Sequence, residues 1–148
     1  MKHVVITGTS RGIGLELVKI FAEKGDQVIA ISRNIQQVEA LQLKNVIPFA
    51  CDLTNSEDLE KLTSYLQKKG QNVDVLINNA GTIVNKPFSE TSTEEFKNVF
   101  NTNVFAVAAI IKSMLPFMNK GSHVVNISSM GGIQGSAKFA GLSAYSSS

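Results

Sequence analysis

The chain has 148 residues, 43% hydrophobic and 18% charged, proportions typical of a globular protein with one core. A net charge of +2, from 14 basic and 12 acidic residues, argues against a basic surface for nucleic acid. The longest apolar run, residues 104–111, is too short to span a bilayer, and one cysteine cannot form an internal disulfide. The first predicted strand begins at His3, which leaves no room for a signal peptide. We therefore expect a cytoplasmic protein that binds neither nucleic acid nor membranes.

The first half of the chain alternates short strands with helical patterns. Runs rich in β-branched residues predict buried strands at residues 3–7, 27–32 and 46–50. A helix ending before Gly25 is predicted from four apolar residues on one face, namely Ile13, Leu17, Ile20 and Phe21. The spacing of Ile35, Val38 and Leu41 predicts a short helix before the third strand.

The second half continues the alternation. Residues 54–70 begin with capping residues and acids and end in lysines and glycine, which predicts a helix that buries Leu59, Leu62 and Leu66. Strands are predicted at residues 73–78 and 123–128, with a long helical pattern over residues 92–118 between them.

Five strands separated by helices predict an α/β fold, a Rossmann-like doubly wound parallel sheet with strand order 3-2-1-4-5. Pro48 cannot donate a ladder hydrogen bond, and this order places its strand at the edge. Ligands of such sheets bind beyond the carboxyl ends of the strands, near strands one and four. The residues that follow each strand are therefore the candidates for chemistry.

A glycine-rich turn, TGTSRGIG, follows the first strand at residues 7–14. Glycine lets the backbone turn sharply and approach a phosphate, and the following helix directs free N–H groups at that anion. Glycines at 8, 12 and 14 do not satisfy the strict G-x-G-x-x-G spacing, and the P-loop pattern fails because no Gly-Lys-Ser/Thr follows.

Further motifs follow in order: CDLTN at residues 51–55, NNAG at 78–81, Asn103 in the long helix, NISSMGG at 126–132, and Tyr145. Together with the turn they resemble the signatures of the short-chain dehydrogenase/reductase family over essentially the whole chain. The resemblance implies one NAD(P)-binding Rossmann domain at residues 1–148. It also implies a nicotinamide dinucleotide site formed by Gly8, Thr9, Ser10, Arg11, Gly12, Ile13, Gly14, Ser32, Arg33, Asp52, Leu53, Asn79, Ala80 and Gly81.

The residues near the adenosine ribose indicate which nicotinamide cofactor is used. Asp26 precedes the second strand and so lies at the wrong end to accept hydrogen bonds from ribose hydroxyls. Ser32 and Arg33 stand at the carboxyl end, and Arg11 adds a second cation. We expect NADP(H) rather than NAD, and no metal site.

The resemblance also implies hydride transfer between nicotinamide and a small-molecule carbonyl or alcohol. Tyr145 would be the general acid/base, Ser129 would hydrogen-bond the substrate oxygen, and Asn103 would hold a water molecule. Ser128 competes with Ser129, and Asn101 with Asn103; the following MGG and NVFAV contexts favour Ser129 and Asn103. The segment GSAKFAGLS, residues 135–143, suggests a longer substrate loop.

The family carries a lysine four residues after its tyrosine, and this sequence ends at Ser148. We expect an N-terminal fragment of a longer single-domain enzyme, lacking the family's C-terminal helix and strands and inactive by itself. Three residues after Tyr145 are too few to hold a helix. An exposed edge at the fifth strand predicts a homo-oligomer, a dimer or tetramer. The alternative is a non-catalytic nucleotide-binding module or a truncated, inactive family member.

Overall fold

A computed structural model describes residues 1–133 and 140–148. Its five strands form one parallel sheet in the order β3-β2-β1-β4-β5, which confirms the predicted fold class. The strands are β1 (His3–Thr7), β2 (Gln27–Ser32), β3 (Val46–Ala50), β4 (Val75–Asn78) and β5 (His123–Asn126). Pro48 lies in β3, at the edge of the sheet, as predicted.

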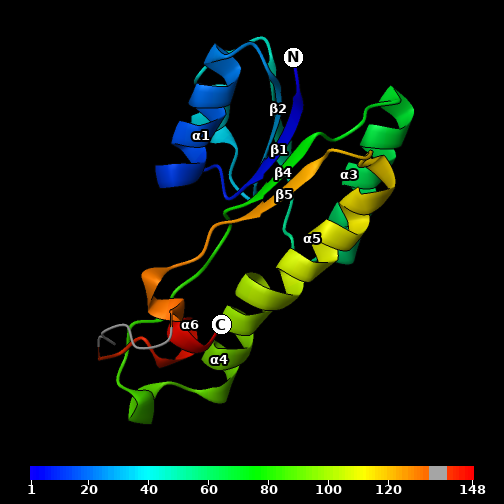
Figure 1. Ribbon diagram of the computed structural model, residues 1–148. Helices are drawn as coiled ribbons and strands as arrows, with labels where there is room; N and C mark the ends of the chain where they lie inside the picture. The colour runs from blue at the N-terminus through cyan, green and yellow to red at the C-terminus, as the bar shows by residue number, and fades with distance from the viewer. Residues whose placement is uncertain (134–139) are drawn as a thin grey trace.

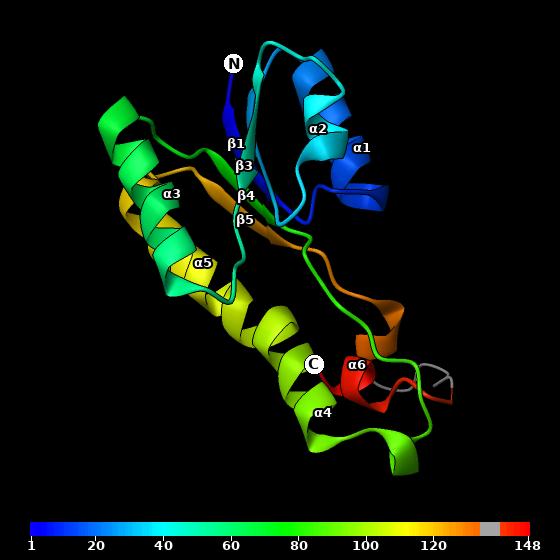
Figure 2. The ribbon, with the colours of Figure 1, turned by 180° about the vertical axis from the view of Figure 1, so that it is seen from behind.

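Helices cover both faces of the sheet. α1 (Gly12–Glu23) and α2 (Gln36–Glu39) lie on one face, and α3 (Ser56–Lys69) and α5 (Ala106–Met114) lie on the other (Figures 1 and 2). Alternate residues of the strands enter separate cores, so that Val4 packs with α1 while Val5 packs with α3 and α5. Both layers are needed because parallel strands are apolar on both faces.

The predictions for the two longest helices of the first half had different outcomes. α3 is confirmed: the Asn55 side chain caps its start, Gly70 closes it at φ 58°, and its buried residues are Leu59, Leu62 and Leu66. The predicted buried face of α1 is partly wrong, because Ile13 and Ile20 are 63% and 45% exposed. Its buried residues are Gly14, Val18 and Ala22. At Gly14 the absence of a side chain allows the close approach of α1 to the Gly8 carbonyl.

Two predicted strands are shorter than expected. β4 begins two residues late, because the Val73 N–H donates to the carbonyl of Phe117 instead of to a neighbouring strand. β5 ends at Asn126, although the next N–H, that of Ile127, still donates to the Asn78 carbonyl. All four residues of β5 are exposed, and it stands at the edge of the sheet.

The long helical pattern forms α4 (Thr93–Phe100), a π-helical turn η2 (Asn101–Phe105), α5, and a 3-10 turn η3 (Leu115–Phe117). Within the described residues, this run has the length and mean hydropathy, 25 residues and 1.4, to cross a membrane. The expectation that the chain does not bind membranes therefore stays a prediction. Mostly buried core helices of soluble proteins meet the same criterion, whereas only 22% of this apolar stretch is buried. The buried residues of α5 are Ala106, Ile110 and Met114.

The remaining elements lie beyond the carboxyl ends of the strands, beside α4 (Figure 1). They are η1 (Phe88–Glu90), η4 (Met130–Gly132) and α6 (Ser143–Ser147). The expectation that no helix forms around Tyr145 is wrong, because Ala144 of α6 is only 1% exposed and tertiary packing supports the short helix. Residues 135–139 of the expected substrate loop lie outside the described residues.

Candidate functional site

A cleft of about 730 Å³ opens where the chain leaves the carboxyl ends of β1, β2, β3 and β4. The fold thus brings together segments that are far apart in sequence, at the place where doubly wound sheets bind nucleotides. Of the residues predicted to bind the cofactor, all but Thr9 and Gly14 line the cleft: Gly8, Ser10, Arg11, Gly12, Ile13, Ser32, Arg33, Asp52, Leu53, Asn79, Ala80 and Gly81.

The glycines of the turn have different physical roles. Gly8 has φ +71°, and a Cβ there would lie 2.7 Å from the Cα of Ala80. A Cβ at Gly14 would collide with the carbonyl oxygen of Gly8, so this glycine lets α1 pack against the turn. Gly12 has φ +58° and nothing within 4 Å of a Cβ, so its missing side chain leaves open space at the start of α1.

The NNAG segment holds the turn in place. The Asn79 side chain donates to the carbonyls of Thr7 and Gly8 at 3.0 and 3.1 Å. The backbone N–H groups of Asn79 and Ala80 donate to the Thr7 hydroxyl at 3.1 and 3.0 Å. Thr9 is fully buried, and its N–H donates to the carbonyl of Ile31. These bonds fix β1, β2 and β4 together beneath the cleft.

The charges around the cleft favour an anionic ligand. Arg11 and Arg33 are the two arginines of the chain, and both are exposed and line the cleft. Among the described lining residues, Asp52 is the only acid. The first turn of α1 carries no acidic residue, so the positive end of the helix dipole is not neutralised by its own side chains.

The wall formed after β3 is braced by α3. The Asp52 carboxylate accepts bonds from the backbone and hydroxyl of Thr54, while the Asp52 N–H donates to the Asp58 carboxylate at 3.0 Å. The hydrogen bond from Lys61 and then that from the Asp52 N–H lower the pKa of Asp58. Burial, followed by the charges of Asp58 and Asp52, raises the pKa of the Cys51 thiol to about 11, so this thiol remains protonated at neutral pH.

The predicted catalytic residues lie outside the lining of the cleft. Asn103 forms a two-way contact with the Thr82 backbone: its Oδ1 accepts from the N–H at 2.8 Å and its Nδ2 donates to the carbonyl at 3.0 Å. Ser129 Oγ accepts from the Gly131 N–H. A Cβ on Gly131 would be 3.6 Å from Ser129 Oγ and 3.7 Å from Ser146 Oγ, so Ser129 lies close to the helix that carries Tyr145.

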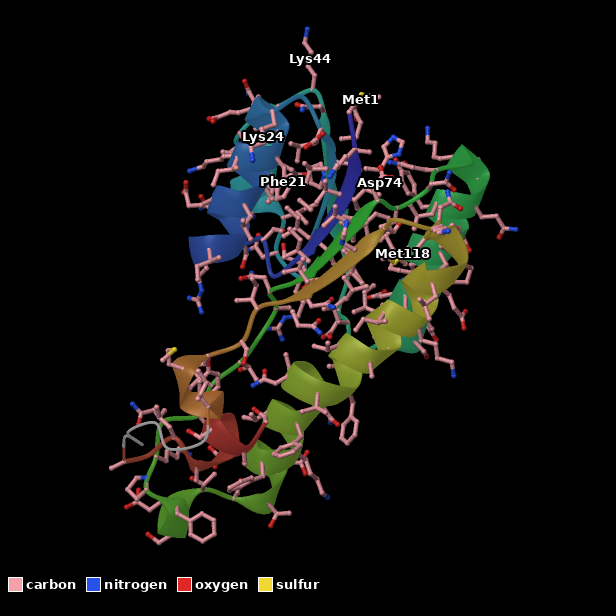
Figure 3. The ribbon with its side chains drawn as sticks, in the orientation of Figure 1. Met1, Phe21, Lys24, Lys44, Asp74 and Met118 are labelled. Atoms are coloured by element: carbon pink, nitrogen blue, oxygen red, sulfur yellow. The ribbon has the colours of Figure 1, made fainter. Side chains whose placement is uncertain are left out.

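Sequence reasoning missed several polar residues of the cleft, namely Asn34, Thr54, Thr82, Asn98 and Thr102. Asn101, which the sequence offered only as an alternative to Asn103, also lines the cleft. Asn98, Asn101 and Thr102 occur at positions i, i+3 and i+4 of the α4–η2 helix, and this spacing indicated that they share one helix face. Asp26 lies away from the cleft, as expected: its carboxylate accepts from the Lys2 N–H. Asp74 likewise accepts from the His3 N–H, at the end of the molecule opposite to α6 (Figure 3).

Comparison with known proteins identifies the family to which the chain belongs. The profile of the short chain dehydrogenase family matches residues 2–148. The chain therefore belongs to the short-chain dehydrogenase/reductase family, whose members are oxidoreductases that use nicotinamide cofactors.

Individual relatives have different stated activities. The chain is 34% identical over 144 residues to an NADPH-dependent pterin aldehyde reductase of Arabidopsis thaliana, with 92% of this chain and 60% of that protein covered. It is 36% identical to the ketoacyl reductase HetN of Nostoc, over 92% of this chain and 50% of that protein. A crystal structure of a short-chain dehydrogenase from Streptomyces avermitilis superposes with a TM-score of 0.88 at 32% identity, covering 99% of this chain and 54% of that chain. The chain thus spans half to three-fifths of the length of these relatives.

Proposed function

We propose that the cleft binds NADP(H) and that the chain belongs to a carbonyl reductase or alcohol dehydrogenase. The observation that carries the proposal is the convergence of the glycine-rich turn, the end of β2, the Asp52 loop and the NNAG segment on one cleft. The residues fit a dinucleotide, because the space beyond Gly12 is open and adjoins the N-terminal end of α1. In this arrangement the α1 end would receive the pyrophosphate.

Preference for NADP(H) over NAD(H) rests on Arg11 and Arg33. A guanidinium can donate two parallel hydrogen bonds to a phosphate and neutralise part of its charge. The ribose hydroxyl of NAD(H) carries no charge, so it gains less from the same guanidinium. The Ser32 hydroxyl donates to the carbonyl of Asn34 at 2.6 Å, which stabilises the bend that carries Arg33. The relative from Arabidopsis, whose name states NADPH dependence, is consistent with this preference.

When bound, the nicotinamide supplies or accepts the hydride. In the proposed reaction Tyr145 transfers the proton to or from the substrate oxygen, and Ser129 donates a hydrogen bond to the same oxygen. Asn103 fixes the Thr82 backbone and so joins the segment after β4 to η2. Ile13, which is 63% exposed and lines the cleft, offers an apolar surface to a cofactor ring.

We propose that the residues that line the cleft suffice for cofactor binding, whereas turnover also needs a cation beside Tyr145. The test compares NADPH oxidation, with a panel of aldehydes and ketones, by the chain and by a form lengthened with lysine at position 149. Turnover only in the lengthened form supports the requirement. Equal turnover by both forms contradicts it. NADPH binding without turnover by either form favours a nucleotide-binding module.

The cofactor assignment is tested by calorimetric titration with NADPH and NADH. The Arg33→Asp variant should weaken NADPH binding by about 10- to 100-fold, the range for a lost charged hydrogen bond, and leave NADH binding unchanged or tighter. Lys44→Asp is the matched control, because Lys44 lies at the end of the molecule opposite to α6 (Figure 3) and does not line the cleft. Equal affinity of the unaltered chain for NADPH and NADH would refute the assignment.

A further inference from the structure

The helix that carries Tyr145 is held at both ends by contacts from other segments. α6 has only five residues, so its orientation depends on its neighbours. Before the helix, the carbonyl of Gly141 accepts from the Lys86 N–H at 2.9 Å. After it, the hydroxyl of Ser148 accepts from the side chain of Asn103 at 2.9 Å. The segment that links β4 to α4 supplies the first contact, and η2 supplies the second.

Gly141 is closely packed against this linking segment. Its φ is +86°, and a Cβ would collide with the Oδ1 of Asn85. The same Cβ would lie 3.3 Å from the Lys86 nitrogen and 3.4 Å from the Lys86 oxygen. Two of the three groups are backbone atoms, which cannot rotate away. A larger residue at position 141 would therefore have to turn the Asn85 side chain away, adopt a strained backbone at φ +86°, and press against the backbone of Lys86.

Lys86 is in turn anchored to the first turn of α4. Its ammonium forms an ion pair with Glu95 Oε1. The other oxygen of Glu95 accepts from the Ser92 N–H at 2.9 Å, and the Glu95 N–H donates to the Ser92 hydroxyl, which completes a capping box. Lys86 first, and then the Ser92 N–H, lower the pKa of Glu95 to about 2. At neutral pH this anchor is therefore charged.

We infer that Gly141 and the Lys86–Glu95 ion pair are positioning elements for Tyr145, through which the α4 helix sets the place of the phenol. The inference rests on the proposed role of Tyr145 in proton transfer. A proton donor displaced by about 1 Å loses up to about 100-fold in rate, so a five-residue helix needs such support. Ser129, the second proposed catalytic residue, lies close to the same helix, because Gly131 lies between the hydroxyls of Ser129 and Ser146.

The experiment reports on Tyr145 without requiring activity. The chain has two tyrosines, so incorporation of 3-fluorotyrosine gives two ¹⁹F resonances. Tyr65 packs edge-on against Phe49, with ring centroids 5.8 Å apart, and serves as the internal reference. Gly141→Ala should shift the Tyr145 resonance toward that of free fluorotyrosine and leave the Tyr65 resonance in place. Gly121→Ala is the matched control, because φ is +94° there and nothing lies within 4 Å of a Cβ.

Three further variants keep the test valid if Gly141→Ala fails to fold. Glu95→Gln removes the charge opposite Lys86 but keeps an oxygen for the Ser92 N–H, and it should also shift the Tyr145 resonance. Glu94→Gln, one residue earlier in the same turn, should not. Lys86→Arg keeps the cation and should preserve the unaltered spectrum. NADPH affinity should be equal in all five variants, because none of the substituted residues lines the cleft.

The outcomes separate this inference from the proposed function. An unmoved Tyr145 resonance in both Gly141→Ala and Glu95→Gln overturns the inference, as does an equal shift in Gly121→Ala. Failure of the unaltered chain to bind NADPH overturns the proposed function and leaves the resonance comparison interpretable. A shift of the Tyr145 resonance in Gly141→Ala and Glu95→Gln but not in the control variants, with NADPH affinity retained, supports both the inference and the proposed function.

Discussion

Replacing Gly8 with alanine tests whether the glycine-rich turn is shaped by its contact with the NNAG segment. Two costs add at this position. The backbone has φ +71°, and a left-handed residue with a Cβ costs about 1–2 kcal/mol. The new Cβ would also lie 2.7 and 2.8 Å from the Cα and nitrogen of Ala80, and overpacking of this kind costs about 1–3 kcal/mol. The expected loss in unfolding free energy is the sum, about 2–5 kcal/mol.

The matched control is Gly25→Ala. Gly25 has φ +83°, but nothing lies within 4 Å of its Cβ position, so only the backbone cost of about 1–2 kcal/mol applies. The assay is urea unfolding followed by circular dichroism, with thermal unfolding as a check. At about 2–4 °C per kcal/mol for a domain of this size, the two variants should differ in Tm by about 2–12 °C. Equal losses for the two variants would show that the approach of Gly8 to Ala80 is not a tight contact.

Three further outcomes follow from the structure. Cys51, with its pKa raised to about 11, should react with iodoacetamide at pH 8 far more slowly than in the urea-unfolded chain; equal rates would contradict its burial. Because the pKa of Glu95 is lowered to about 2, its contribution to stability is complete above pH 4.5 and is lost as the pH falls toward 2. The difference in unfolding free energy between the unaltered chain and Glu95→Gln should therefore be larger at pH 7 than at pH 2.5, and a constant difference would argue against the ion pair. Val125, 40% exposed on edge strand β5, should promote self-association, so Val125→Lys should lower the mass measured by light scattering, whereas Ile20→Lys on α1 should not.

The sheet could be predicted because its signals are local. Each strand is a short β-branched run, and Pro48 identified an edge. The position of the cleft followed from the fold rule that parallel strands present their carboxyl ends at one side. Twelve of the fourteen predicted cofactor residues line it, and Thr9 and Gly14 lie beneath it as part of the packing.

The errors arose where tertiary contacts override local preference. The apolar pattern of α1 favoured Ile13 and Ile20, but the face that packs against the sheet carries Gly14, Val18 and Ala22. Nucleation alone disfavours a helix at Tyr145, yet contacts at both ends support α6.

The π-helical turn at η2 is a further feature that the pattern did not predict. It spans Asn101–Phe105 and includes both candidate asparagines. The spacing of apolar residues indicates which face of a helix is buried. It does not indicate where one extra residue widens a helical turn into a π-helical turn. Such turns occur frequently at functional sites. In this chain, Asn101 lines the cleft while Asn103 binds the Thr82 backbone.

The central claim, that the cleft is an NADP(H) site, is tested most directly by a ¹⁵N NMR titration of the chain with NADPH. We predict saturable shifts in the amides of residues 8–14, 32–33 and 52–53, three separate segments that line the cleft or lie directly beneath it. The amides of β5, at the exposed edge of the sheet, should move less. No saturable shift, or a shift centred on β5 with residues 8–14 unmoved, would contradict the account.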